Sequence, residues 1–220
     1  TFATGRVKAE VTDFGEDLDS STIFTFEVKF DPGQKTFDIE KYGPEIQRFA
    51  KAAATFGNGA ALVEGNSDPT LALQHFFWAA KAKGLLTGSR GGYKFKGRPI
   101  TLENIPAIVA AIKSEDLSGQ TRTNKAGQRV EIPDPRTTVA AAQQLSKERA
   151  MNFVKSIQDY AKKHDLNIDI SAAIPSGVGI ANPAIARPRN IGQARENMRV
   201  VFRIVKVKAE ALSADDFNFE

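Results

Sequence analysis

Alternating apolar and polar residues predict the strands of this protein. The alternation is clearest in residues 22–30 (TIFTFEVKF) and 198–207 (MRVVFRIVKV). A period of two places every second side chain on one face of a strand, so both segments are expected to be half-buried strands. Two shorter apolar segments, residues 60–64 and 167–174, are expected to be strands as well, and residues 5–11 could add one at an edge.

Apolar residues at helical spacing predict the helices. Residues 39–55 carry apolar side chains at every third or fourth position, and a longer helix is expected to begin with Thr137 or Thr138 as its cap and to end near His164. Two shorter helices are expected at residues 71–83 and about 105–113. Gly-rich, Pro-rich or polar segments at 88–99, 114–136 and 175–190 are expected to be turns, loops or hairpins.

The order of these elements predicts the fold class. Strand, helix, strand, helix, strand, strand describes an α/β sandwich in which helices pack on a mixed sheet. Residues 1–220 are expected to form a single domain, because no internal repeat divides them. Within it, residues 70–144 are expected to be an insertion of helices and loops between the second strand and the long helix. Residues 209–220 are expected to be a loose acidic tail.

The composition excludes several classes of function. The chain has no cysteine, which excludes disulfides, thiolate metal sites and a cysteine nucleophile. Its two histidines are isolated from any metal-ligand spacing, so neither a metal nor another cofactor is expected. No apolar run approaches the ~20 residues of a membrane span. The chain begins at Thr1, so we expect it to be a piece of a longer protein that carries any export signal or membrane anchor.

The charge of the protein is concentrated in one segment. The whole chain carries +4, but residues 70–144 have eleven basic and five acidic residues, a net charge of +6, which leaves −2 for the remainder. Bases and two aromatic residues alternate in residues 90–98, a pattern seen in nucleic-acid contacts. Because so few residues take part, a solvated basic loop explains the pattern better, and we expect an acidic protein or polymer, not nucleic acid, as a partner.

One charged residue lies where an apolar side chain is expected. Arg149 is in the middle of the apolar stripe of the long helix, since Leu145 and Phe153, four positions away on either side, point within about 40° of it. A guanidinium in that position is costly unless it is paired and hydrogen-bonded. Two interpretations are open: Arg149 makes a structural ion pair or extends to solvent, or it grips the carboxylate of a ligand with two parallel hydrogen bonds.

An acidic residue is expected close to Arg149. Asp68 follows the predicted strand at residues 60–64, and ligands in α/β sheets bind at the carboxyl ends of strands. An acid and a base at that edge could bind a zwitterion, with Asp68 taking an ammonium group and Arg149 a carboxylate. This pair is the candidate ligand-binding site, and no catalytic residues are expected.

Five motifs, in order along the chain, resemble the peptidoglycan-binding domain of the OmpA family, which includes Pal lipoproteins and the flagellar stator protein MotB. They are Phe30-Asp31 with YGPEI at 42–46, VEGNSD at 63–68 against E-G-H-T-D, LSKERA at 145–150 against L-S-x-x-R-A, GVGIANP at 177–183 against G-x-G-x-x-x-P, and NMRV at 197–200 against N-R-R-V. The closing motif is most similar to a branch in which this domain follows a periplasmic ABC-type solute-binding domain. The resemblance leaves residues 70–144 unexplained.

The resemblance implies a non-enzymatic anchor in the periplasm or cell envelope of a Gram-negative-type bacterium. It implies that the domain binds the meso-diaminopimelate of the peptidoglycan stem peptide, with Asp68 receiving the ammonium and Arg149 the carboxylate. Further positions that match the family's pocket are Ser67, Gly65 and Asn66 in the loop, with Asp31 and Arg199 as neighbours. Three departures stand out: Asn66 replaces a His, Ala142 replaces an Asn, and Asp68 and Arg149 are 81 positions apart where the family has a short loop.

Two other functions are consistent with the sequence. The chain could be a protein-interaction module of the same fold, in which residues 70–144 cover the pocket and bind an acidic partner. Hydrolysis of cell wall is the weaker alternative, because no paired carboxylates, metal triad or nucleophile with a base occurs at a recognisable spacing.

Overall fold

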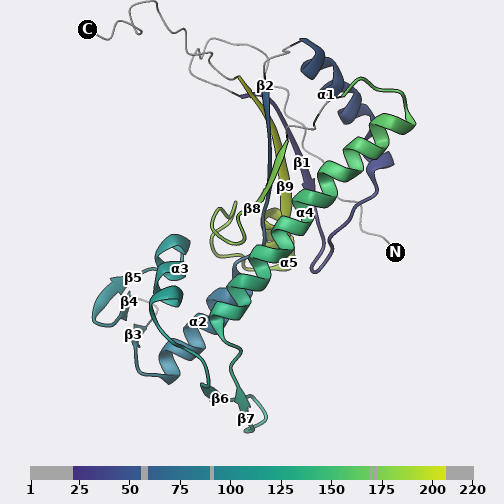
Figure 1. Cartoon of the computed structure of the whole chain (residues 1–220). Helices are drawn as coiled ribbons and strands as arrows, with labels where there is room; N and C mark the ends of the chain where they lie inside the picture. The colour runs from purple at the N-terminus through teal and green to yellow at the C-terminus, as the bar shows by residue number, and fades with distance from the viewer. Residues whose placement is uncertain (1–21, 56–58, 90–91, 169, 171–172, 207–220) are drawn as a thin grey trace, which may run out of the picture.

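The computed structural model of the chain describes residues 22–55, 59–89, 92–168, 170 and 173–206. The elements are β1 Thr22–Lys29, η1 Ile39–Tyr42, α1 Gly43–Thr55, β2 Gly59–Gly65, α2 Thr70–Ala82, β3 Leu86–Ser89, β4 Gly92–Phe95, β5 Arg98–Ile100, α3 Ile105–Ser114, β6 Thr121–Thr123, β7 Arg129–Glu131, α4 Pro135–Lys163, β8 Ile174–Gly177, α5 Ile191–Asn197 and β9 Arg199–Lys206 (Figure 1). The predicted edge strand at residues 5–11 and the acidic tail at 209–220 lie outside the described residues.

A mixed sheet with helices on one face forms the larger part of the protein. Its strand order is β1-β9-β2-β8, in which β9 runs antiparallel to both β1 and β2, and β8 runs parallel to β2. Side chains from α1, α4 and the strands belong to one buried cluster, so both helices cover the same face. The predicted α/β fold with helices on a mixed sheet is therefore confirmed. We call residues 22–69 and 145–206 the frame and residues 70–144 the insertion.

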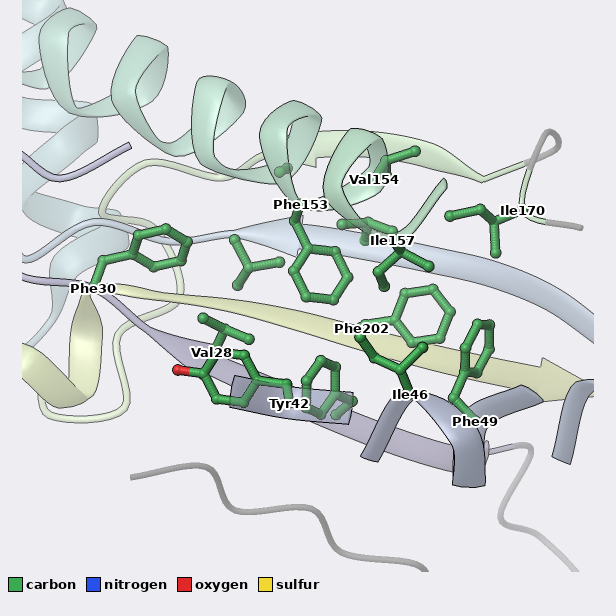
Figure 2. Packing of buried hydrophobic residues seen from close by; sticks show 14 of the residues in the cluster. Val28, Phe30, Tyr42, Ile46, Phe49, Phe153, Val154, Ile157, Ile170 and Phe202 are labelled. Atoms are coloured by element: carbon green, nitrogen blue, oxygen red, sulfur yellow. The ribbon is translucent and has the colours of Figure 1, made fainter. Parts of the chain in front are cut away.

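Alternate residues of β1 and β9 build the core of the frame. Phe26 and Val28 lie opposite Phe202 and Val200 in the antiparallel register, and all four are buried. The ring of Phe153 on α4 lies 5.7 Å from that of Phe26 and 5.9 Å from that of Phe202. Figure 2 shows Phe153 reaching down from α4 onto the strands. This packing explains the strong period-two pattern in the sequence, because only one face of each strand is covered.

The third strand differs from the sequence prediction. It was predicted at residues 167–174, but β8 spans Ile174–Gly177 and, apart from Ile174, lies in the predicted connection at 175–190. The apolar residues Leu166, Ile168 and Ile170 pack against the core without forming a described strand. β8 is a short edge strand with a proline and with Ile174 76% exposed, so its sequence carries no alternating pattern.

The cap of helix α4 lies three or four residues earlier than predicted. Asp134, not Thr137 or Thr138, is the cap residue, and its side chain accepts a hydrogen bond from the backbone N–H of Arg136. Pro135 occupies the first helical position, where its fixed φ and missing N–H are tolerated. The extra turn lengthens α4 to 29 residues, which is long enough to run along both the frame and the insertion (Figure 1).

The insertion has a hydrophobic core of its own. This second buried cluster joins α2, α3 and the small sheet β3-β4-β5, and residues from the first turns of α4, including Val139 and Ala142, pack against it. Where the sequence predicts a Gly-rich turn at residues 88–99, the structure has this three-stranded sheet, and the predicted polar hairpin is the pair β6-β7. Figure 1 shows the insertion gathered at the N-terminal end of α4, beyond the end of the main sheet.

Close backbone contact fixes α4 against the ends of β2 and β8. A Cβ atom added at Gly65 would overlap the carbonyl of Ser146, and one added at Gly177 would overlap the backbone of Lys147. Only glycine permits this approach of helix and strand. The helix position that carries Arg149 is therefore held directly over the carboxyl end of β2.

A histidine contact joins α2 of the insertion to α4. His75 Nδ1 lies 2.8 Å from Thr138 Oγ1, and the imidazole is 8% exposed. Burial, reinforced by the nearby charge of Arg122, lowers the pKa of His75 below its ordinary value. The folded protein therefore favours the neutral imidazole.

This contact predicts a loss of stability at mildly acidic pH. Since the folded-state pKa of His75 is lowered, its contribution is complete above the ordinary histidine pKa and is lost as the pH falls below that value. His164→Gln leaves His75 as the single histidine. We expect this variant to lose more free energy of unfolding between about pH 7.5 and 5.5 than His75→Gln/His164→Gln does. Urea unfolding measures both, and identical pH dependence in the two variants would contradict the assignment.

Candidate functional site

A cavity of about 550 Å³ lies at the carboxyl end of β2. Its walls come from the turn after β1, the loop between β2 and α2, the first turn of α2, the N-terminal half of α4, and the segment 188–198 that contains α5. The insertion thus supplies one wall of the cavity through Leu71 and Ala142. Two lining residues, Leu71 and Ile191, are more than half exposed, so within the described chain the cavity opens to solvent.

Arg149 is fully buried in the wall of this cavity. Three of its N–H groups donate to backbone carbonyls: Nε to Gln34 at 2.9 Å, one terminal nitrogen to Asn66 at 2.9 Å, and the other to Asp31 at 3.3 Å. The guanidinium also lies 5.1 Å from the ring centre of Phe30. A guanidinium has five N–H donors, so these bonds leave two that could bind a ligand.

The positive charge of Arg149 has no carboxylate partner among the described residues. The carbonyls that hold it carry only partial charges, and burial lowers the pKa of the guanidinium to about 10. It remains protonated at neutral pH, but a displacement of this size corresponds to a cost on the order of 3 kcal/mol for the charged form. A ligand carboxylate in the cavity would offset part of that cost.

Asp68 lies in the same cavity and is held in place by two hydrogen bonds. Its Oδ1 accepts from the backbone N–H of Thr70 at 2.9 Å, and its Oδ2 accepts from the side-chain amide of Asn197 at 3.0 Å. No lysine or arginine of the described chain forms an ion pair with it. The cavity is therefore lined by one aspartate, Asp68, and by two arginines, Arg149 and Arg189, and no ion pair within the described protein joins any of them to an opposite charge.

Ser67 lines the cavity next to Asp68 and ties three segments together. Its hydroxyl donates to the carbonyl of Ala142 at 2.9 Å, and its backbone N–H donates to the carbonyl of Gly179 at 2.8 Å. The hydroxyl of Ser146 in turn accepts from the backbone N–H of Gly179 at 2.9 Å. These bonds hold the β2–α2 loop, α4 and the loop after β8 at fixed positions around the carboxylate.

The other four predicted site residues lie outside the cavity lining. Gly65 packs against α4, and Asn66 is buried with its side-chain amide on Glu64. Asp31 forms an ion pair with Arg195 at 2.7 Å, and Arg199 contacts Glu27 at 3.6 Å and donates to the carbonyl of Glu196. Asn66 and Asp31 still support the site, because their carbonyls bind Arg149.

Asn197 is a site residue that the sequence analysis did not single out. It is fully buried, its amide donates to Asp68 Oδ2 and to the carbonyl of Ile185, and its side-chain oxygen accepts from the N–H of Ile185. Asn197 is the first residue of the NMRV motif, so its position was part of the sequence analysis. The sequence did not show that its side chain donates a hydrogen bond to Asp68. The apolar lining residues Leu71 and Ile191 were also missed, because isolated aliphatic residues carry no motif.

The described chain contains no group of three or more His, Asp or Glu residues placed to hold a metal ion. Within the same residues, no helix is both long enough and apolar enough to span a membrane. The cavity instead offers opposite charges for binding.

Solved structures that are similar to the chain share low sequence identity with it. The peptidoglycan-associated lipoprotein from Burkholderia pseudomallei is 11% identical, with 81% of this chain and 88% of that chain covered and a TM-score of 0.42. The periplasmic domain of Helicobacter pylori MotB is 16% identical, with 93% and 91% covered and a TM-score of 0.41. The OmpA-like domain of FopA1 from Francisella tularensis is 14% identical, with 92% and 80% covered and a TM-score of 0.38.

These structures come from the family that the five sequence motifs indicate. No protein-family model and no curated protein sequence matches the chain.

The Asn197 contacts predict a strong effect of a small substitution. Asn197→Ala removes three hydrogen bonds of a fully buried side chain, so we expect the free energy of unfolding to fall by about 2 to 4 kcal/mol. The matched control is Asn152→Ala, which removes one exposed bond to the carbonyl of Lys35 and should cost less than about 1 kcal/mol. Urea unfolding compares the two variants, and equal losses would show that Asn197 does not hold the site together.

Proposed function

We propose that this protein is a non-catalytic cell-wall anchoring domain of the cell envelope that binds peptidoglycan through the meso-diaminopimelate residue of the stem peptide. One observation carries the proposal: a carboxylate and a guanidinium that lack counter-charges line a single cavity. In the proposed complex Asp68 binds the ligand ammonium and Arg149 binds the ligand carboxylate.

The chemistry of diaminopimelate fits this pair of charges. Its side chain ends in one carbon that carries both an ammonium and a carboxylate, so the two charges are presented together and remain available when the residue is part of a peptide. An ordinary residue within a peptide offers no such zwitterion. A guanidinium binds a carboxylate with two parallel hydrogen bonds, and Arg149 has two N–H groups for that purpose.

The surroundings of the two charges favour binding over catalysis. Asp68 is already bonded on both oxygens, and Arg149 is held by three carbonyls, so neither side chain needs to reorganise to receive a ligand. Preorganised sites lose less entropy on binding. A non-catalytic role in the periplasm, next to the cell wall, follows from this proposal.

The test removes the negative charge of Asp68 and keeps its shape. Asp68→Asn should weaken binding of a diaminopimelate-containing stem peptide by about 30-fold or more, because breaking a desolvated charged contact costs ~2 to 5 kcal/mol. Isothermal titration calorimetry gives the affinity. Asp68→Asn is preferable to a change at Arg149, since removing the guanidinium also leaves three carbonyls without their donor.

The matched control is Asp116→Asn. Asp116 accepts a hydrogen bond from a backbone N–H two residues later, as Asp68 does, but lies outside the cavity. A second control is a stem peptide with lysine in place of diaminopimelate, which keeps the ammonium and lacks the carboxylate. If Asp68→Asn binds like the parent, or if the lysine peptide binds as well as the diaminopimelate peptide, the proposed site is wrong.

Binding of an acidic protein or polymer by the insertion is a second candidate function. The described insertion contains ten lysines and arginines, and Lys96 alone has a carboxylate within salt-bridge distance, that of Glu115. Exposed cations without counter-charges attract polyanions, and the attraction weakens as salt is added. This candidate does not require the insertion to cover the cavity. Leu71, which the insertion contributes to the cavity wall, is exposed.

Charge reversal tests this second function separately. Lys94→Glu/Arg98→Glu/Lys125→Glu should abolish salt-sensitive binding of polyglutamate while binding of the stem peptide is retained. The control reverses three exposed lysines of α4, Lys147, Lys155 and Lys162, which gives the same change in net charge. Fluorescence anisotropy with labelled polyglutamate measures the affinity. Equal losses in the two variants would mean that total charge, and not the insertion, attracts the polymer.

A further inference from the structure

The cavity has a pronounced apolar side that the two charges do not use. Besides Asp68 and Arg149, its walls include aliphatic side chains from the insertion, from α4 and from the segment around α5. They are Leu71, Ala142, Leu145, Ile191, Ala194 and Met198. A zwitterionic group alone would leave this side of the cavity without a partner.

Two of these aliphatic residues are exposed at the cavity. Leu71 is 55% exposed and Ile191 is 57% exposed, and they account for two of the five large hydrophobic residues that are strongly exposed in the described chain. Exposed apolar side chains gathered at a concave site, next to polar groups, are typical of ligand-binding grooves.

Both residues are held by local hydrogen bonds at the starts of helices. Leu71 is in the first turn of α2, whose N-terminus is held by the bond from Thr70 N–H to Asp68. Ile191 is the first residue of α5, where the side chain of Asn190 accepts from the backbone N–H of Gln193. The same Asp68 carboxylate that would bind the ammonium therefore also positions Leu71.

The cavity has room for more than the zwitterion. Its volume of about 550 Å³ is within the ~300 to 1,000 Å³ range of pockets that enclose drug-sized ligands. The end of one amino-acid side chain occupies only part of that volume. The remaining space borders Leu71 and Ile191, so a group joined to the zwitterionic residue would meet apolar surface there.

We propose that the cavity binds a small aliphatic side chain of the residue adjacent to the zwitterionic residue in the same peptide, and that Leu71 and Ile191 form this apolar subsite. The inference rests on the proposed function. In a stem peptide the adjacent side chain is the methyl group of an alanine that follows diaminopimelate. Leu71 belongs to the insertion, so the insertion takes part in choosing the ligand.

The subsite is tested with two peptides that differ by this alanine. We expect the parent protein to bind a stem tetrapeptide, with alanine after diaminopimelate, about 10-fold more tightly than the tripeptide that ends at diaminopimelate, because one apolar group in such a pocket contributes a factor of this size. Leu71→Ser and Ile191→Ser should each reduce that preference and together remove it.

Leu62→Ser is the matched control. Leu62 is 46% exposed on the frame and does not line the cavity, so its replacement should leave the preference for the tetrapeptide unchanged. The replaced leucine and isoleucine side chains are exposed, and thermal unfolding verifies that each variant is folded before titration.

The outcomes separate the subsite from the proposed function. If Leu71→Ser/Ile191→Ser keeps the full preference for the tetrapeptide while Asp68→Asn loses both peptides, the apolar subsite is wrong and the zwitterion site stands. If the parent binds both peptides with equal affinity, the subsite is also wrong. If the parent binds neither peptide, the proposed function fails and the subsite fails with it.

Discussion

The buried guanidinium of Arg149 is the interaction on which the architecture of the site depends. It extends from α4 and binds the carbonyls of Asp31 and Gln34 after β1 and of Asn66 after β2, so a single side chain joins two loops to one helix. Three hydrogen bonds from a charged donor compensate for much of the lost hydration. They do not neutralise the charge, and the pKa of the guanidinium is lowered because burial still disfavours its charged form. The structural role of Arg149 and the ligand-binding role that we propose for it therefore depend on the same geometry.

The structure corrects one of the two interpretations of Arg149 that the sequence left open, and the other stays a proposal. Its position in the apolar stripe was predictable, because helical spacing places it between Leu145 and Phe153. Its hydrogen-bond partners were not predictable, since backbone carbonyls have no sequence signature. The expected structural ion pair is absent from the described chain, and the guanidinium does not extend to solvent, because it is fully buried. What remains is a structural cation in the wall of a cavity.

The elements that the sequence predicted well are those with one covered face. β1 and β9 alternate over most of their length because the helices cover one side of the sheet, and α4 shows its period for the same reason. β8 and α5 were missed for a different reason: both are short, and hydrogen bonds to neighbouring segments, such as that of Asn197 with Ile185, hold the chain around them. The sequence assigned Asp68, Ser67 and Arg149 to one pocket, and all three line the cavity. Its apolar walls were missed, because they come from segments that are distant in the sequence and meet only after folding.

The place of the insertion follows from the length of α4. The helix carries the frame core on its C-terminal half and the insertion core on its first turns, so the two bodies share one rigid element. The cavity lies where these halves meet, and it takes Asp68 and Arg149 from the frame and Leu71 and Thr138 from the insertion. A ligand in this cavity would contact both bodies, and its binding energy would then stabilise the docking of the insertion as well as the site. The 80 residues between Asp68 and Arg149 thus extend the site, because they return the chain to α4 with an additional wall.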